Sequence, residues 1–104
     1  MSKRPISDLS YEEIEKICEI AEDAARKYIM SKVPSEYISD LSVSVDVESM
    51  ETLNVDIEIE IELSPIYRKA NAEEIAKDSL KAAFDAIERY LENIRSQARN
   101  EANI

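Results

Sequence analysis

Two stretches in the middle of the chain decide its fold: Leu41-Ser42-Val43-Ser44-Val45-Asp46-Val47-Glu48 and Leu53-Asn54-Val55-Asp56-Ile57-Glu58-Ile59-Glu60-Ile61-Glu62-Leu63. In both stretches apolar residues alternate with polar ones, which is the period of a β-strand that buries one face. Two such strands in an antiparallel hairpin place their apolar residues on one face and their acidic residues on the other. The sequence therefore predicts a hairpin with an acidic face, made by Asp46, Glu48, Asp56, Glu58, Glu60 and Glu62.

The hairpin connection decides which residues of the two strands lie opposite each other. Because the apolar residues carry odd numbers in both strands, the loop must contain an odd number of residues unless a bulge intervenes. A loop of Met50 to Thr52 would set Asp46 opposite Asp56, which brings two like charges together. A five-residue loop, Glu48 to Thr52, sets Asn54 opposite Asp46 instead. We therefore predict the longer loop.

Helix signals lie on both sides of the hairpin. Ser10 and Glu13 have the spacing of a capping box, and apolar residues at helical spacing follow until Pro34 ends the pattern. Asn71 with Glu74 marks the start of a second helix, whose apolar residues step by three and four over roughly 28 residues. This order predicts an α+β fold of two layers, α-β-β-α, with both helices on one face of the hairpin.

A chain of 104 residues predicts a single domain. We place it at residues 10–99, between an N-terminal tail at 1–9 and a frayed C-terminal tail at 100–104. A two-stranded sheet is marginally stable by itself, and both of its edges are open to another strand. We therefore expect a homodimer or a heterodimer, with an interface on the second strand and the second helix formed by Val55, Ile57, Ile59, Ile61, Phe84, Ile87 and Leu91.

Composition excludes several classes of function. The chain has no glycine, no histidine and one cysteine, so it lacks a phosphate-binding glycine loop, a histidine-based catalytic triad and a cysteine or histidine metal site. We expect Cys18 to be buried as a small apolar residue. An enzyme using paired carboxylates and a metal is the weakest hypothesis, because nothing places the carboxylates in a cleft. We predict no catalytic residue, cofactor or metal.

Charge and hydropathy limit the partners. The net charge is −10, and the segment between Val33 and Tyr67 holds nine acidic residues and no Lys or Arg. Such a segment repels nucleic acid, so we expect no direct nucleic-acid binding. No apolar run approaches the ~20 residues that span a membrane, and no signal sequence is visible, so we predict a cytoplasmic protein. The acidic face itself is interpreted as a solvated surface, a docking site for a basic protein or a divalent-cation site.

Longer stretches resemble a small archaeal family of uncharacterised proteins of about this length, typically encoded beside the prefoldin beta subunit. The resemblance covers roughly residues 9 to 95. It is carried by Met30-Ser31-Lys32-Val33-Pro34, by Leu41 to Glu48, by Val55 to Pro65, and by Ala82-Ala83-Phe84-Asp85-Ala86-Ile87-Glu88-Arg89-Tyr90-Leu91.

That family in turn is similar to the small dimerising subunit of KEOPS, the complex that makes threonylcarbamoyladenosine in tRNA. The resemblance implies a paralogue that pairs with the dimerising subunit as a fifth, non-catalytic component. The chain departs from that subunit because Pro5 to Leu9 is too short and polar for a strand before the first helix, and because Asp78-Ser79 stands where the subunit has an Asn-Ser pair. A homodimeric acidic adaptor linked to prefoldin or translation is the alternative.

Overall fold

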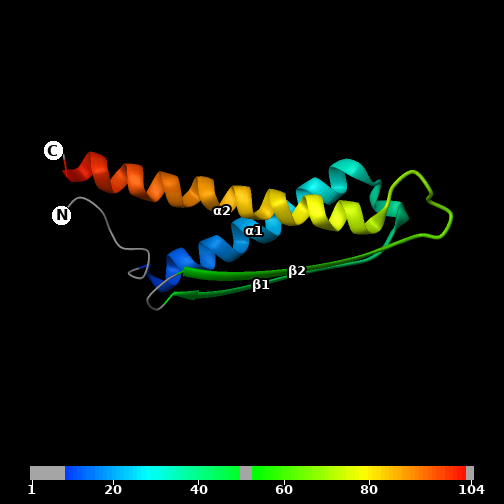
Figure 1. Cartoon of the computed structure of the whole chain (residues 1–104), viewed down its shortest axis with the longest axis horizontal. Coiled ribbons are helices and arrows are strands. Elements are labelled where there is room, and N and C mark those ends of the chain that lie inside the picture. Colours follow the sequence, from blue (N-terminus) through cyan, green and yellow to red (C-terminus); the bar gives the residue numbers. More distant parts are fainter. Residues whose placement is uncertain (1–8, 50–52, 103–104) are drawn as a thin grey trace.

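The computed structural model describes residues 9–49 and 53–102 of the chain. The elements follow the order α1 (Tyr11–Lys32), a short 3-10 helix (Ser35–Tyr37), β1 (Ile38–Ser49), β2 (Leu53–Leu63) and α2 (Ala72–Ala102). The two strands form one antiparallel sheet, β1-β2 (Figure 1). The predicted α+β class and the α-β-β-α order are thus confirmed.

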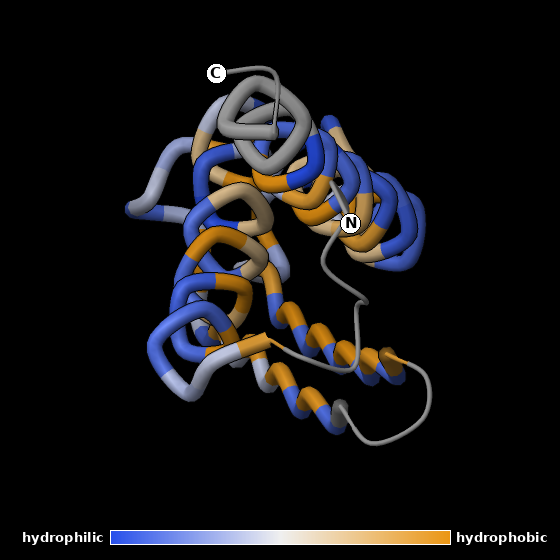
Figure 2. The backbone as a smooth tube through the Cα atoms, turned by 90° about the vertical axis from the view of Figure 1, so that its left-hand side faces the viewer, coloured by the Kyte–Doolittle hydropathy of each residue, from blue (hydrophilic) through white to orange (hydrophobic). Residues whose placement is uncertain are grey.

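Both helices lie on the same face of the hairpin, and Figure 2 shows the orange, apolar side of each strand turned toward them. Helix α1 packs over β1 and α2 packs over β2, and the two helices also pack against each other. Helix α2 runs past the hairpin end of the sheet (Figure 1), which gives an elongated molecule 57 Å along its longest axis. In the described part of the chain, neither helix combines the length and the apolar character needed to cross a membrane.

The predicted helix boundaries are present. The Ser10 Oγ accepts a hydrogen bond from the Glu13 N–H at 3.2 Å, and the Glu13 Oε1 accepts one from the Ser10 N–H at 2.9 Å. Helix α1 ends where Val33 turns extended before the proline, with φ −131° and ψ 127°. The Asn71 Oδ1 accepts from the Glu73 N–H at 2.8 Å and caps α2.

Described structure is present on both sides of the predicted limits of the domain. Leu9, assigned to the N-terminal tail, packs against the core. Helix α2 has 31 residues and continues to Ala102, past the predicted end of the domain at Arg99. The rest of the predicted tails, residues 1–8 and 103–104, lies outside the described residues.

The predicted five-residue hairpin loop is wrong. The observed register pairs Asp46 with Asp56, Glu48 with Asn54 and Ser49 with Leu53, which leaves three residues, 50–52, between the strands. The shorter loop brings Glu48 and Ser49 into the ladder as additional pairs, and this gain outweighs the repulsion within the Asp46–Asp56 pair. The loop residues themselves lie outside the described residues.

The core lies mainly between the helices. Two clusters of buried side chains form it, Ile17, Ala21, Ala25, Ala83 and Ile87 near the middle, and Ile29, Val33 and Ile75 near the end of α1. Small alanine side chains on both helices allow the helix axes to approach closely. The buried Ser79 lies at the same contact, where its Oγ donates to the Ala76 carbonyl at 2.8 Å.

Candidate interaction surface

The apolar face of the sheet is only partly covered by the helices. Every inward side chain of β2 is half-buried, and so is every described inward side chain of β1. The fully buried side chains come from the helices and from Val33, and none of them comes from the described part of a strand. The helices therefore leave part of the apolar strand surface accessible to solvent.

The flank of α2 beside β2 is apolar. The buried residues of α2 step by four, from Ile75 through Ala83 to Ile87. At 3.6 residues per turn, Leu80, Phe84 and Leu91 fall to one side of this row.

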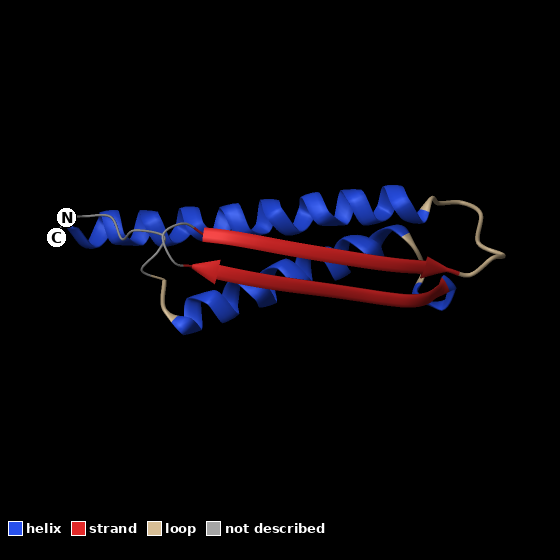
Figure 3. Cartoon of the chain, turned by 60° about the horizontal axis from the view of Figure 1, so that its bottom comes forward, coloured by secondary structure: helices blue, strands red, loops and turns tan. Residues whose placement is uncertain are grey.

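The other side of α2 faces α1. The Tyr28 hydroxyl donates to Asp78 Oδ2 at 3.3 Å there, and Ala86 and Asn93 line the groove between the helices with Ala24 of α1. Leu80, Phe84 and Leu91 thus lie on the flank of α2 away from α1, and Figure 3 shows this helix running beside the outer edge of β2.

Phe84 is the most exposed of the three apolar residues on that flank. Its side chain is 39% exposed, whereas Leu80 and Leu91 are half-buried, and Leu91 also packs against the core. Aromatic side chains are enriched in protein–protein interfaces, which makes Phe84 the candidate contact residue of this flank. We call this surface, formed by the free edge of β2 with Leu80, Phe84 and Leu91, the β2 surface.

The corresponding flank of α1, beside β1, is charged. Glu15, Glu22 and Arg26 lie on it, and the Arg26 Nε donates to the Glu22 Oε1 at 3.0 Å. Cys18 lies on the same side of α1 and is half-buried. Burial and then the negative charge of Asp46 raise the pKa of the Cys18 thiol, which places this side chain close to the acidic row of β1.

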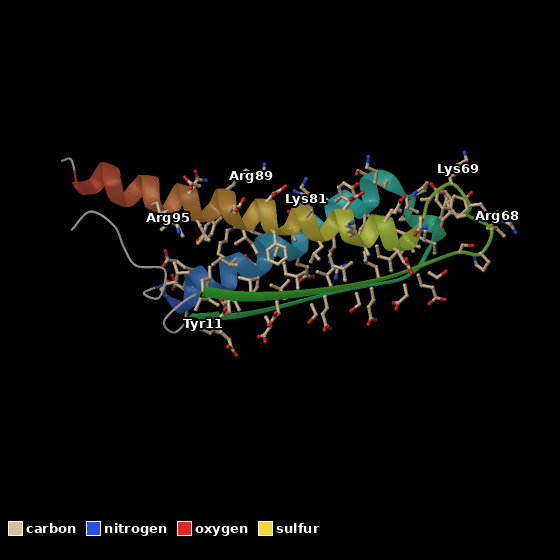
Figure 4. The ribbon with its side chains drawn as sticks, viewed as in Figure 1. Tyr11, Arg68, Lys69, Lys81, Arg89 and Arg95 are labelled. Atoms are coloured by element: carbon tan, nitrogen blue, oxygen red, sulfur yellow. The ribbon has the colours of Figure 1, made fainter. Side chains whose placement is uncertain are left out.

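The six carboxylates predicted for the acidic face share one side of the sheet. All six carboxylates assigned to it are exposed, and Figure 4 shows a row of oxygen-bearing side chains projecting from the strands away from the helices. Among the described residues, none of the six forms an ion pair, and no group of three or more acidic or cysteine side chains is arranged to hold a metal ion. The arrangement is a continuous negative surface.

The predicted interface residues do not all reach the surface. Val55, Ile57 and Ile59 pack against the central cluster, and Ile59 and Ile61 pack against the second one. Ile87 is only 4% exposed and serves the chain's own core. Among the described side chains of the α2 flank, the surface keeps Phe84 and Leu91 and adds Leu80, and the half-buried residues of β2 contribute only their exposed part.

A second group of exposed residues lies at the end of the molecule away from the hairpin end of the sheet. The Tyr37 and Tyr67 rings stack with their centroids 4.8 Å apart and pack on the core. This contact joins the segment before β1 to the segment after β2. Ile66 is 78% exposed beside them, and Arg68 and Lys69 project into solvent at this end (Figure 4). The stacking explains the two tyrosines as packing residues.

A search for similar proteins gives the family. Residues 6–90 match a family described as protein of unknown function, DUF3194. The chain belongs to this family. An uncharacterized protein of Pyrococcus furiosus is 30% identical over 92 residues, which cover 88% of this chain and 82% of that protein. An uncharacterized protein of Pyrococcus horikoshii is 27% identical over 93 residues, which cover 89% of this chain and 79% of that protein. The predicted membership of an archaeal uncharacterised family is thus confirmed.

Two solved structures share the fold. The solution structure of the hypothetical protein mth677 from Methanothermobacter thermautotrophicus superposes with a TM-score of 0.75 at 25% identity, covering 91% of this chain and 99% of that one. A crystal structure from Thermococcus onnurineus NA1 gives a TM-score of 0.74 at 25% identity, covering 91% of this chain and 89% of that one. The α-β-β-α arrangement is therefore common to these proteins.

Proposed function

We propose that this protein is a non-catalytic interaction subunit that pairs, through the β2 surface, with the small dimerising subunit of the KEOPS tRNA-modification complex in the archaeal cytoplasm. The observation that carries the proposal is the free β2 edge beside the exposed Phe84 side chain. The choice of partner rests on the resemblance of the sequence to a paralogue of that subunit.

Strand addition explains why such a domain needs a partner. An added strand would form hydrogen bonds with the unpaired backbone N–H and C=O groups along β2. It would also extend the sheet beneath the apolar flank of α2. A helix carried by the partner would then cover Leu80, Phe84 and Leu91 together with the half-buried apolar residues of β2. The pairing would thus complete both layers of the fold at once.

A non-catalytic role fits the residues available. Acid–base catalysis at neutral pH most often uses histidine, which this chain lacks. The single thiol, Cys18, has a raised pKa, so it is a poor nucleophile. We therefore assign the chain a structural and partner-selecting role within the complex.

The test is light scattering on the purified chain, on the purified small KEOPS subunit, and on their mixture at micromolar concentration. We expect a one-to-one heterodimer to replace the separate species. No complex at that concentration contradicts the proposal. Recovery of prefoldin without any KEOPS subunit in a co-purification would support the homodimeric adaptor instead.

Matched variants locate the contact. Phe84→Lys should weaken binding of the small KEOPS subunit at least about tenfold, since it replaces an aromatic contact by a charge. Met30→Lys is the control, because Met30 is 48% exposed on α1 and lies away from the β2 surface. Titration calorimetry with both variants, after circular dichroism shows that each is folded, measures the difference. Equal weakening by the two substitutions would place the contact elsewhere.

A further inference from the structure

We propose that the outward carboxylates of β2 make this edge selective for an unlike strand with basic outward residues and exclude a second copy of this chain. This inference rests on the proposed function and specifies the chemistry of the partner strand. It also gives the acidic face a role at the β2 surface beyond remaining solvated.

The geometry of two paired β2 strands supports the exclusion of a second copy of this chain. Two β2 strands that pair antiparallel with their helices on the same side place outward residues opposite outward residues. With Glu58 on the two-fold axis, Glu58 faces its own copy and Asp56 faces Glu60. With Ile57 or Ile59 on the axis, Asp56 faces Glu58 or Glu58 faces Glu60. Every such register sets carboxylate against carboxylate along the middle of the strand, and like charges directly opposite each other destabilise a sheet.

The hairpin itself shows which neighbour this row accepts. Across from Glu58 and Glu60 lie Ser44 and Ser42 of β1, which are small and uncharged. Like charges face each other only toward the two ends of the described ladder, where Asp46 pairs with Asp56 and Asp40 with Glu62. On one side, therefore, the central carboxylates of β2 face serines. Because β1 already provides the uncharged side, an incoming strand on the other side should offer basic residues, which add attraction.

The apolar part of the β2 surface makes this selection necessary. Inward residues of β2 and the Phe84 flank would bind any apolar strand and helix without discrimination. The outward row adds a repulsive element against the commonest competitor, which is another copy of the same chain at the same concentration. Attraction comes from the inner face and selectivity from the outer one.

A charge-reversed copy tests the inference directly. Glu58→Lys/Glu60→Lys gives a β2 strand whose outward residues complement those of the wild type. We expect this variant to form a one-to-one dimer with wild-type protein at low salt, doubling the mass from 11.9 kDa, while neither protein dimerises alone. Raising the salt concentration should weaken that dimer at least about tenfold, since its selectivity is electrostatic.

The matched control reverses two charges on the other strand. Asp46→Lys/Glu48→Lys changes the net charge by the same amount on β1, and it should not dimerise with the wild type. A dimer with both variants would show that bulk charge drives association, and a dimer with neither would show that β2 is not the pairing edge. Self-association of the wild-type chain through β2 would also overturn the inference. Circular dichroism confirms that both variants are folded.

The same variants separate this inference from the proposed function. If the wild type binds the small KEOPS subunit, Glu58→Lys/Glu60→Lys should bind it at least about tenfold more weakly. If the wild type fails to bind that subunit but pairs with the charge-reversed copy, the proposed partner is wrong and the selectivity of the β2 edge stands. If the wild type binds the subunit and the reversal leaves that affinity unchanged, the selectivity is wrong and the pairing stands.

Discussion

The two free edges of this hairpin differ although their strands are equally alternating. Beside β1, helix α1 presents the Glu22–Arg26 ion pair and the half-buried thiol of Cys18. Beside β2, helix α2 presents Leu80 and Phe84. In our proposal, the helix flank next to an open strand decides whether that strand binds a partner. A charged helix flank favours exposure of the neighbouring strand edge to water. Burial of an apolar helix flank by a partner lowers the free energy of the complex.

From Leu41 to Glu48 and throughout β2, odd-numbered strand residues face the helices and even-numbered residues face water. Ile59→Lys should destabilise the fold by about 3 kcal/mol, because Ile59 packs against both core clusters and a lysine there would lose this packing and place a charge at a half-buried apolar position. Thermal and urea unfolding measure this loss. Glu60→Lys, on the adjacent outward position, should change the free energy of unfolding by no more than about 0.5 kcal/mol. Equal effects would break the assignment of faces.

The acidic face should lower the free energy of unfolding where two carboxylates lie directly opposite each other. Asp56→Asn should raise the free energy of unfolding by about 0.3 kcal/mol at low salt, since it removes the like charge opposite Asp46. Urea unfolding at low and high salt measures the gain, which should shrink as salt screens the repulsion. Glu58→Gln serves as the control, because Ser44 lies opposite Glu58. A larger gain from the control would contradict the observed register.

The reactivity of the Cys18 thiol depends on the negative charges near the β1 edge. Burial, followed by the charges of Asp46, Glu15 and Glu22, raises its thiol pKa above the ordinary value of 9.0. The folded thiol should therefore react more slowly with iodoacetamide at mildly alkaline pH than the thiol of the unfolded chain. Asp46→Asn should speed the folded reaction about twofold, and Glu60→Gln, on the other strand, should leave it unchanged.

The same shift makes stability depend on pH. Because the folded pKa lies above the unfolded one, this group's contribution to stability is complete below the unfolded pKa and is lost as pH rises through the folded pKa. Denaturant unfolding of the wild type and of Cys18→Ser across mildly alkaline pH measures it. An identical pH profile for both would contradict a raised thiol pKa.

Local sequence signals predicted most of the fold. The capping box at Ser10, the amide cap at Asn71 and the stop before Pro34 act through neighbours in the chain, so they could be read directly. The alternation of the strands likewise predicted the acidic face. The loop length could not be settled in this way, because it depends on the balance between a whole ladder of pairs and one repulsion at Asp46.

The sequence by itself determined the two helices, the two strands and which face of the hairpin is acidic, since the spacing of apolar and charged residues sets these patterns locally. Only the tertiary structure decided the register and the lateral position of each helix. That position makes Ile87 a core residue and leaves Phe84 exposed beside β2. The physical reason is that packing the alanines of the two helices against each other sets how each helix is rotated over the sheet, and this rotation depends on contacts between segments far apart in the chain.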